Sequence, residues 1–309
     1  LRSLVGSEMC IRDRFCIGLL LTVATIVNAQ SVTWISSTEG NVWQKSKVKL
    51  QSKSEQNPVL QVDGTENGVA FKNWGTTFNE LCWDALGLLT RTEQDEILYN
   101  IFSPQGDLRI TRGRISMGAN DYARSWYSCD EVEGDFELRY FNINRDKQTI
   151  IPFIRAAQKY NPNLTFWISP WCPPSWMKIN GDYPVLSSPF NSLSEKQNYL
   201  LYGATGGQVD ENEMKLTGAR DGVFPRQLAT TDFMIQDPRY LQTYADYFCR
   251  FIDAYKEQGI PIDMVMYQNE AYSYTPYPGC AWTATGTIRF NKEYLAPTLR
   301  QMHPEVKLY

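Results

Sequence analysis

Short apolar runs typical of strands alternate with amphipathic segments typical of helices from about residue 70 to the end of the chain. The helix expected after Asp237-Pro238 shows this best, because its apolar residues recur every three or four positions, at Leu241, Tyr244, Ala245, Phe248, Ile252 and Tyr255. Gly259 and Pro261 then end it before the strand "IDMVMYQ". Strands that alternate with such helices predict parallel βα units in an α/β protein.

The same unit recurs along the chain. Strands are expected in "GVAFKNWGTTF", "LRITRGRISMGAN", "LTFWISPW", "IDMVMYQ" and "EVKLY". Between the first two, Thr90 and Glu93 have the spacing of a capping box for a helix that begins at about Arg91. A closed (β/α)8 TIM barrel has eight such units over roughly 250 residues, so we expect its N-terminal half. A doubly wound open sheet is the alternative, but no Gly-rich phosphate turn follows the first strand.

We expect three parts along the chain. Residues 1–29 are interpreted as an N-terminal artefact, since residue 1 is not Met, followed by a secretory signal peptide whose apolar run spans Phe15 to Val27. That run is shorter than the about 20 residues that span a bilayer, so we expect export to the periplasm or exterior and no stable membrane insertion. Residues 30–65 alternate like short antiparallel strands, and residues 66–309 form the incomplete barrel.

Charge, cysteine and histidine content exclude several classes of function. Residues 30–309 carry 27 basic and 32 acidic residues, and this slightly acidic balance does not indicate nucleic-acid binding. Their five cysteines are widely spaced with no C-x-x-C pair, so neither a disulfide framework nor a metal site is expected, and no organic cofactor is implied. Whether Cys172 pairs with Cys280 stays open. The single histidine, His303, is expected to be solvated in a helix-to-strand loop.

Polar and aromatic residues gather where three of the predicted strands end, in "GRISMGANDYARSWYS", "ISPWCPPSWMKING" and "QNEAYSY". Parallel strands in a barrel bring such ends to one face, and the long polar insert at 181–235 would overhang that face. Plainer interpretations exist for each residue. Arg114 and Asp121 would then form an ion pair, Trp171 and Trp176 would be core aromatics, and Glu270 would be a solvated loop carboxylate.

The chemical interpretation centres on Glu270. A carboxyl group that neighbouring Trp and Tyr rings desolvate has its pKa raised from about 4.3 toward about 6, which suits a glycosidic general acid. Asn269 beside it could bind a sugar hydroxyl, and indole rings offer flat faces to the C–H groups of a sugar.

Together, "RISMGANDYARSWYS", "SPWCPPSWMKING" and "QNE" resemble glycoside hydrolase family 30, the glucosylceramidase and β-1,6-glucanase family, from about Ala70 to Tyr309. The resemblance implies a (β/α)8 barrel joined to an accessory β-sandwich, to which residues 30–65 would contribute. It also implies site residues: Glu270 as acid/base, Asn269 as partner of the sugar 2-hydroxyl, Arg114 as the residue that orders the site, and Asp121 and Trp171 as hydroxyl-binding residues.

The sequence departs from the family pattern at three points. Trp74, in "FKNWGTTFNE", stands where many members have a glycine-rich "GFGG" strand, and Ala271 stands where many have proline. The third concerns the nucleophile, because a retaining mechanism needs a second carboxylate about 5 Å from the first. In the family that glutamate lies on strand seven, whereas the predicted strands of this chain number five, so we expect the nucleophile to be absent and the segment to be inactive alone.

We therefore expect a secreted retaining β-glycosidase that acts on a β-glucoside oligosaccharide, polysaccharide or glycolipid, with glucosylceramidase-like and endo-β-1,6-glucanase activities as the nearest matches. Two alternatives remain: a xylan-active family member, and a non-catalytic carbohydrate-binding protein on the same scaffold.

Overall fold

The computed structural model describes residues 31–49, 73–193, 232–271 and 273–309. The chain divides into two compact units, Leu1–Val69 and Ala70–Tyr309. The predicted signal peptide lies outside the described residues, as does most of the 181–235 insert. No described helix is long and apolar enough to cross a membrane.

The described part of the first unit is an antiparallel hairpin of β1 (Ser31–Thr38) and β2 (Asn41–Lys49). Gly40 lies in the connecting turn with a φ of +79°, a conformation that glycine adopts at no steric cost. Antiparallel strands were predicted here, and the hairpin confirms them as far as Lys49. Trp34 and Trp43 are both exposed within this unit.

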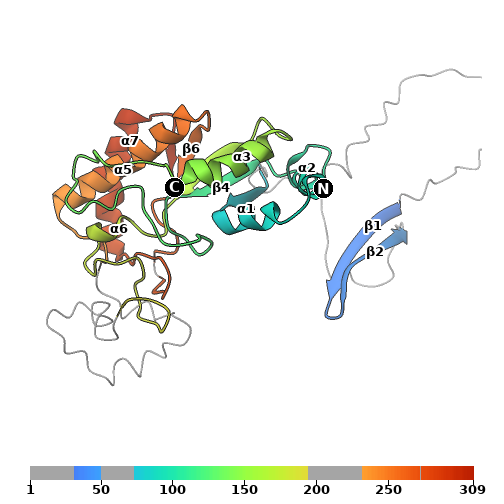
Figure 1. The fold of residues 1–309 in the computed structure, drawn as a ribbon, viewed down its shortest axis with the longest axis horizontal. Helices are drawn as coiled ribbons and strands as arrows, with labels where there is room; N and C mark the ends of the chain where they lie inside the picture. Colours follow the sequence, from blue (N-terminus) through green and yellow to red (C-terminus); the bar gives the residue numbers. More distant parts are fainter. Residues whose placement is uncertain (1–30, 50–72, 194–231, 272) are drawn as a thin grey trace, which may run out of the picture. The chain divides into compact units, whose positions relative to one another are not determined.

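The second unit is built on a five-stranded parallel sheet in the order β3-β4-β5-β6-β7. Its strands are β3 (Gly75–Phe78), β4 (Arg112–Ser116), β5 (Thr165–Ser169), β6 (Ile262–Val265) and β7 (Lys307–Leu308). Strands that neighbour one another along the chain also neighbour one another in the sheet, as the βα repeat predicted (Figure 1).

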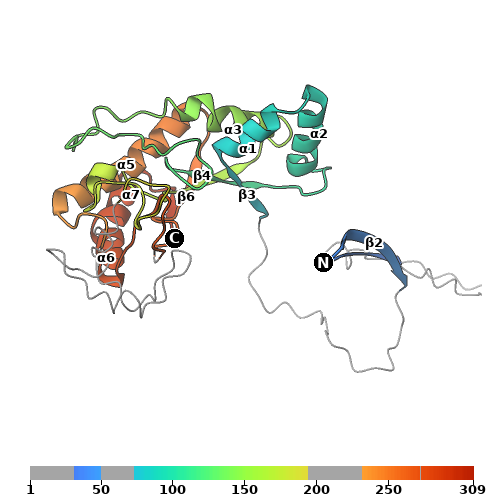
Figure 2. The ribbon, with the colours of Figure 1, turned by 60° about the horizontal axis from the view of Figure 1, so that its bottom comes forward.

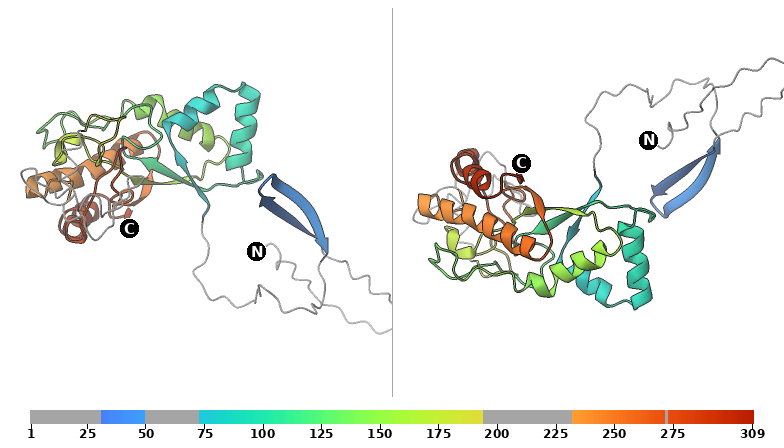
Figure 3. Two further views of the ribbon diagram at one scale, coloured as in Figure 1. Left: turned by 90° about the horizontal axis from the view of Figure 1, so that it is seen from below. Right: turned by 90° about the horizontal axis from the view of Figure 1, so that it is seen from above.

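Helices connect successive strands. They are α1 (Glu80–Gly87), α2 (Arg91–Phe102), α3 (Ile150–Gln158), α5 (Pro238–Glu257), α6 (Ala284–Arg289) and α7 (Ala296–Met302), with a π-helical turn at Phe290–Leu295. The predicted capping box of α2 is present, since Thr90 and Glu93 exchange side-chain and backbone hydrogen bonds. Figure 2 shows α1 and α3 over β3 and β4, and Figure 3 shows α5 beside α7.

The two faces of the sheet carry different side chains. Phe78, Ile115, Phe166 and Ile168 are fully buried on the side of the helices. Gly113 is required there, because a Cβ would lie 2.5 Å from the Phe78 ring and 2.9 Å from the Phe166 ring. The alternate residues of β4, Arg112 and Arg114, lie on the opposite face, as side chains alternate along a strand. The site is built on this second face.

The structure corrects the prediction for His303. It lies in the loop between α7 and β7 as expected, but it is only 3% exposed. Its Nε2 atom lies 3.5 Å from Oδ1 of Asp253 on α5, so packing of the helix ends removes it from solvent. Cys172 and Cys280, whose pairing was left open, are buried free thiols.

Candidate active site

Arg114 on β4 connects three strand ends. Its Nε and Nη2 atoms donate to Oγ of Ser169, at 2.9 and 2.6 Å, and Nη2 also donates to Oδ1 of Asn269 at 2.7 Å. Arg114 pairs in register with Trp167 on β5, and Ser169 lies two residues further toward the carboxyl end on the same face. The guanidinium therefore points toward the carboxyl ends of the strands, where barrel enzymes place their active sites.

Trp171 covers the guanidinium from the other side. The Arg114 Cζ atom lies 4.0 Å from the centre of the Trp171 ring and 5.0 Å from that of Trp167, so both indoles make cation–π contacts. Burial lowers the pKa of Arg114 to about 10, while the charges of Asp121 and Glu270 oppose that shift. The guanidinium thus stays charged at neutral pH, and its hydrogen bonds go to Ser169 and Asn269 rather than to Asp121.

Asn269 and Glu270 follow β6 in a tight turn. The backbone N–H of Asn269 donates to the Pro170 carbonyl at 2.8 Å, and Glu270 has a φ of +46°, an uncommon conformation for a residue with a side chain. We expected nearby rings to desolvate the Glu270 carboxylate, but its side chain is exposed. This expectation is therefore wrong. The left-handed backbone of Glu270 is local strain of a kind that is concentrated at functional sites.

Gln268 fixes the base of this turn. Its Nε2 atom donates to the Trp171 carbonyl at 2.6 Å, and its Oε1 atom accepts from the Trp282 indole at 3.2 Å. Trp171 is 6% exposed and Trp282 is 1% exposed. Trp176, by contrast, packs edge-on against Phe136 with ring centres 5.4 Å apart, which supports the core-packing interpretation for that residue.

Asp121 and Tyr277 bring further polar groups to the site. Burial raises the pKa of Asp121, the Trp171 side chain lowers it and the Glu270 charge raises it, so all three groups lie within electrostatic reach of one another. The Trp171 Nε1 atom is buried without a hydrogen bond of regular geometry. Burial also raises the pKa of Tyr277, and the charges of Asp121 and Glu270 act in the same direction.

The structure brings all five predicted residues together at the carboxyl ends of β4, β5 and β6: Arg114, Asp121, Trp171, Asn269 and Glu270. The sequence interpretation missed Ser169, Gln268 and Tyr277. Ser169 lies inside the quoted "ISPW" stretch and Tyr277 lies in the aromatic run after Glu270, so a signal for both was present.

No group of three or more His, Cys, Asp or Glu side chains among the described residues is arranged to hold a metal ion. The chemistry available to these residues is that of two exposed carboxylates, an amide, a guanidinium and aromatic rings. Such a set suits the recognition of neutral hydroxylated molecules and proton transfer to them.

Comparison with known proteins finds a family model that matches part of the second unit. Residues 71–188 match the model of the glycosyl hydrolase family 30 TIM-barrel domain. Residues 71–188 therefore resemble the barrel domain of family 30. The matched region contains Arg114, Asp121 and Trp171, and Asn269 and Glu270 lie beyond it.

Two curated proteins with different activities in their names are similar to the chain. The chain is 24% identical over 305 residues to endo-1,6-β-D-glucanase neg1 of Aspergillus fumigatus. The aligned region covers 93% of this chain and 55% of the glucanase. The chain is 26% identical over 226 residues to mouse lysosomal acid glucosylceramidase, covering 71% and 35%. The chain thus spans about half or less of the length of the curated relatives that it matches.

Among solved structures, SrfJ from Salmonella typhimurium superposes with a TM-score of 0.60 at 19% identity, covering 89% of this chain and 52% of that one. At that identity the likeness shows the fold alone. It agrees with a TIM-barrel domain, of which the parallel sheet forms part.

Proposed function

We propose that this chain is part of a retaining β-glycosidase that acts on β-glucosides, with Glu270 as its acid/base. The observation that carries the proposal is the hydrogen bond from Arg114 to Asn269, which fixes the residue next to Glu270 beside Trp171 and Asp121. Family 30 members are glycoside hydrolases, and the relatives named above include a β-1,6-glucanase and a glucosylceramidase.

Each residue has a proposed role. Asn269 holds the 2-hydroxyl of the sugar, Asp121 and the Trp171 indole hold outer hydroxyls, and Arg114 keeps Asn269 and Trp171 in place. Glu270 protonates the glycosidic oxygen as the bond breaks and then activates water. Its carboxylate is exposed in the free protein, so we propose that the bound sugar itself excludes water from it.

The proposed double displacement also needs a nucleophile. Among the described residues, the charge of Glu270 acts on the carboxyl group of Asp121, and we assign Asp121 to hydroxyl binding. We therefore propose that the nucleophile is a glutamate outside these 309 residues and that they do not complete a catalytic cycle alone. We further propose that β1–β2 belongs to an accessory sandwich and that residues 1–29 direct export, which N-terminal sequencing of the secreted protein tests.

The experiment is a substrate comparison on the protein expressed from its complete reading frame. Hydrolysis of β-1,6-gluco-oligosaccharides, an aryl β-glucoside, glucosylceramide and xylan is measured for the wild type and for Glu270→Gln. Activity on at least one β-glucoside that falls in the variant supports the proposal, and the preferred substrate names the activity. Binding of glucosides without hydrolysis by the wild type would favour the carbohydrate-binding alternative. The exposure of Glu270 is the observation that supports this alternative.

A further inference from the structure

The loop that carries Asp121 has a narrow base. The N–H of Ala119 donates to the carbonyl of Tyr127 at 2.7 Å, which closes residues 119–127 into a compact turn. Gly118 permits this closure, because it has a φ of +84° and a Cβ there would lie 2.8 Å from the Tyr127 carbonyl oxygen. Residues 119–127 are called the Asp121 loop below.

A buried glutamate holds one side of the Asp121 loop. Glu80, the first residue of α1, is fully buried. Its carboxylate accepts the backbone N–H of Arg124 at 2.8 Å and two hydrogen bonds from Arg145, at 2.9 and 2.6 Å. Arg145 in turn donates to the side chain and the carbonyl of Ser125, both at 2.9 Å. Burial raises the pKa of Glu80, but these hydrogen bonds outweigh it and hold the pKa below its usual value.

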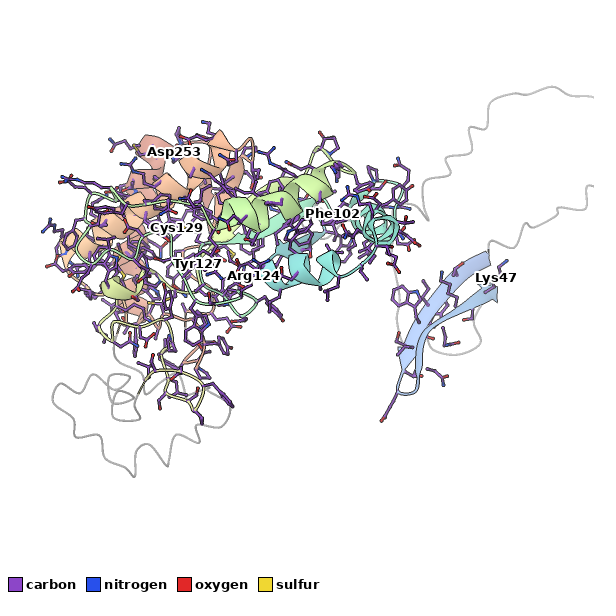
Figure 4. All side chains as sticks on the ribbon, viewed as in Figure 1. Lys47, Phe102, Arg124, Tyr127, Cys129 and Asp253 are labelled. Atoms are coloured by element: carbon purple, nitrogen blue, oxygen red, sulfur yellow. The ribbon has the colours of Figure 1, made fainter. Side chains whose placement is uncertain are left out.

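A second buried carboxylate holds the base of the loop. Asp146, which follows Arg145 directly, is fully buried and accepts the hydroxyl of Tyr127 at 2.7 Å and that of Tyr255 on α5 at 2.6 Å. The Arg145 guanidinium lies 4.0 Å from the centre of the Tyr127 ring, so Arg145 and Tyr127 together connect Glu80 to Asp146. Figure 4 labels Arg124 and Tyr127 on the segment that follows β4.

These contacts converge on one short segment. Besides Arg124, Ser125 and Tyr127, the Tyr122 carbonyl accepts the N–H of Leu81 on α1 at 3.1 Å. Four residues that closely follow Asp121 are thus held by contacts to α1, Arg145 and Asp146. We propose that Glu80, Arg145 and Asp146 are positioning residues that act through the Asp121 loop to set the place of the Asp121 carboxylate. The proposal rests on the proposed function for the sugar-binding role of Asp121.

Tyr127→Phe is the most conservative test, because it removes one hydroxyl from the network and keeps the ring that packs under Arg145. Glu80→Gln keeps the shape of the side chain and removes its charge. Glu137→Gln is the matched control, since Glu137 is an exposed carboxylate paired with Arg139 and outside the network. Hydrogen–deuterium exchange of residues 119–127 and the affinity for methyl β-D-glucoside are both measured on the protein expressed from its complete reading frame. Each variant is also made in an Asp121→Asn background.

We expect Tyr127→Phe and Glu80→Gln to speed exchange within 119–127 while β4 and β5 stay protected, and to weaken glucoside binding by roughly fivefold or more. In the Asp121→Asn background the same changes should leave affinity unaltered, because they act through Asp121. Exchange that stays unchanged, or that rises evenly along the chain, would overturn the proposal, and so would an affinity loss that persists without Asp121. A wild type that binds no glucoside would overturn the proposed function, while the exchange pattern would still decide whether the network positions the loop.

Discussion

The Nη2 atom of Arg114 donates to Oδ1 of Asn269 at 2.7 Å, across 155 positions of sequence. This bond joins the middle of β4 to the residue just past β6, with Ser169 on β5 between them. This hydrogen bond orients the Asn269 amide with its oxygen toward Arg114. A charged donor that binds the oxygen of an amide fixes which way the amide oxygen and nitrogen point.

Arg114→Lys should weaken glucoside binding about tenfold or more, because an ammonium cannot serve Ser169 and Asn269 together while lying flat on Trp171. Titration calorimetry with methyl β-D-glucoside measures this. Arg112→Lys is the control, since Arg112 lies two residues earlier on the same face and bonds Asp263 instead. Equal losses in both variants would mean that Arg114 acts only on stability.

Gly113→Ala should lower the free energy of unfolding by about 1–3 kcal/mol, because the added methyl group overlaps the Phe78 and Phe166 rings. Gly87→Ala is the matched control, as a Cβ there meets nothing within 4 Å. Urea unfolding followed by tryptophan fluorescence gives both values. A neutral Gly113→Ala would contradict the close approach of these rings across the sheet.

The buried Asp146 makes a pH dependence testable. Burial raises its pKa to about 6, although the Tyr255 and Tyr127 hydroxyls lower it and the Glu80 charge adds to the rise. The folded protein therefore binds this proton more tightly than an unfolded chain, in which the pKa is about 3.9. The resulting stability is fully present below about pH 4 and is lost as pH rises through about 6, an effect of order 3 kcal/mol.

Asp146→Asn removes that titration. The Tm difference, wild type minus variant, should decrease as the pH is raised from 4 to 7.5. Differential scanning calorimetry measures this difference. Other carboxylates titrate in both proteins and cancel in the difference. The exposed Asp107→Asn serves as the control. A difference that stays constant over this range would show that Asp146 keeps its charge in the folded protein.

Much of the fold follows from local sequence. The order of strands and helices was predictable because apolar periodicity records which face each element buries, as in α5, and because Thr90 and Glu93 mark the start of α2. The grouping of Arg114, Trp171 and Asn269 was predictable because parallel strands share one carboxyl edge.

Other features depend on contacts between distant segments. No neighbouring residue type signals the exposure of Glu270 or its positive φ. The burial of His303 depends on where α5 ends in space. The part played by Ser169 becomes visible only once the register pairs Arg114 with Trp167. Long-range packing of this kind leaves no periodic pattern in the sequence.

The central claim is that Glu270 donates and later accepts the proton of glycosidic cleavage. The most direct measurement is kcat/KM of Glu270→Gln, expressed within its complete reading frame, for aryl β-glucosides whose leaving groups differ in pKa. We predict a loss of roughly 100- to 10,000-fold for poor leaving groups and a much smaller loss for activated ones, with azide restoring turnover on the activated substrates. An equal loss on every substrate, or none on any, would contradict the acid/base assignment.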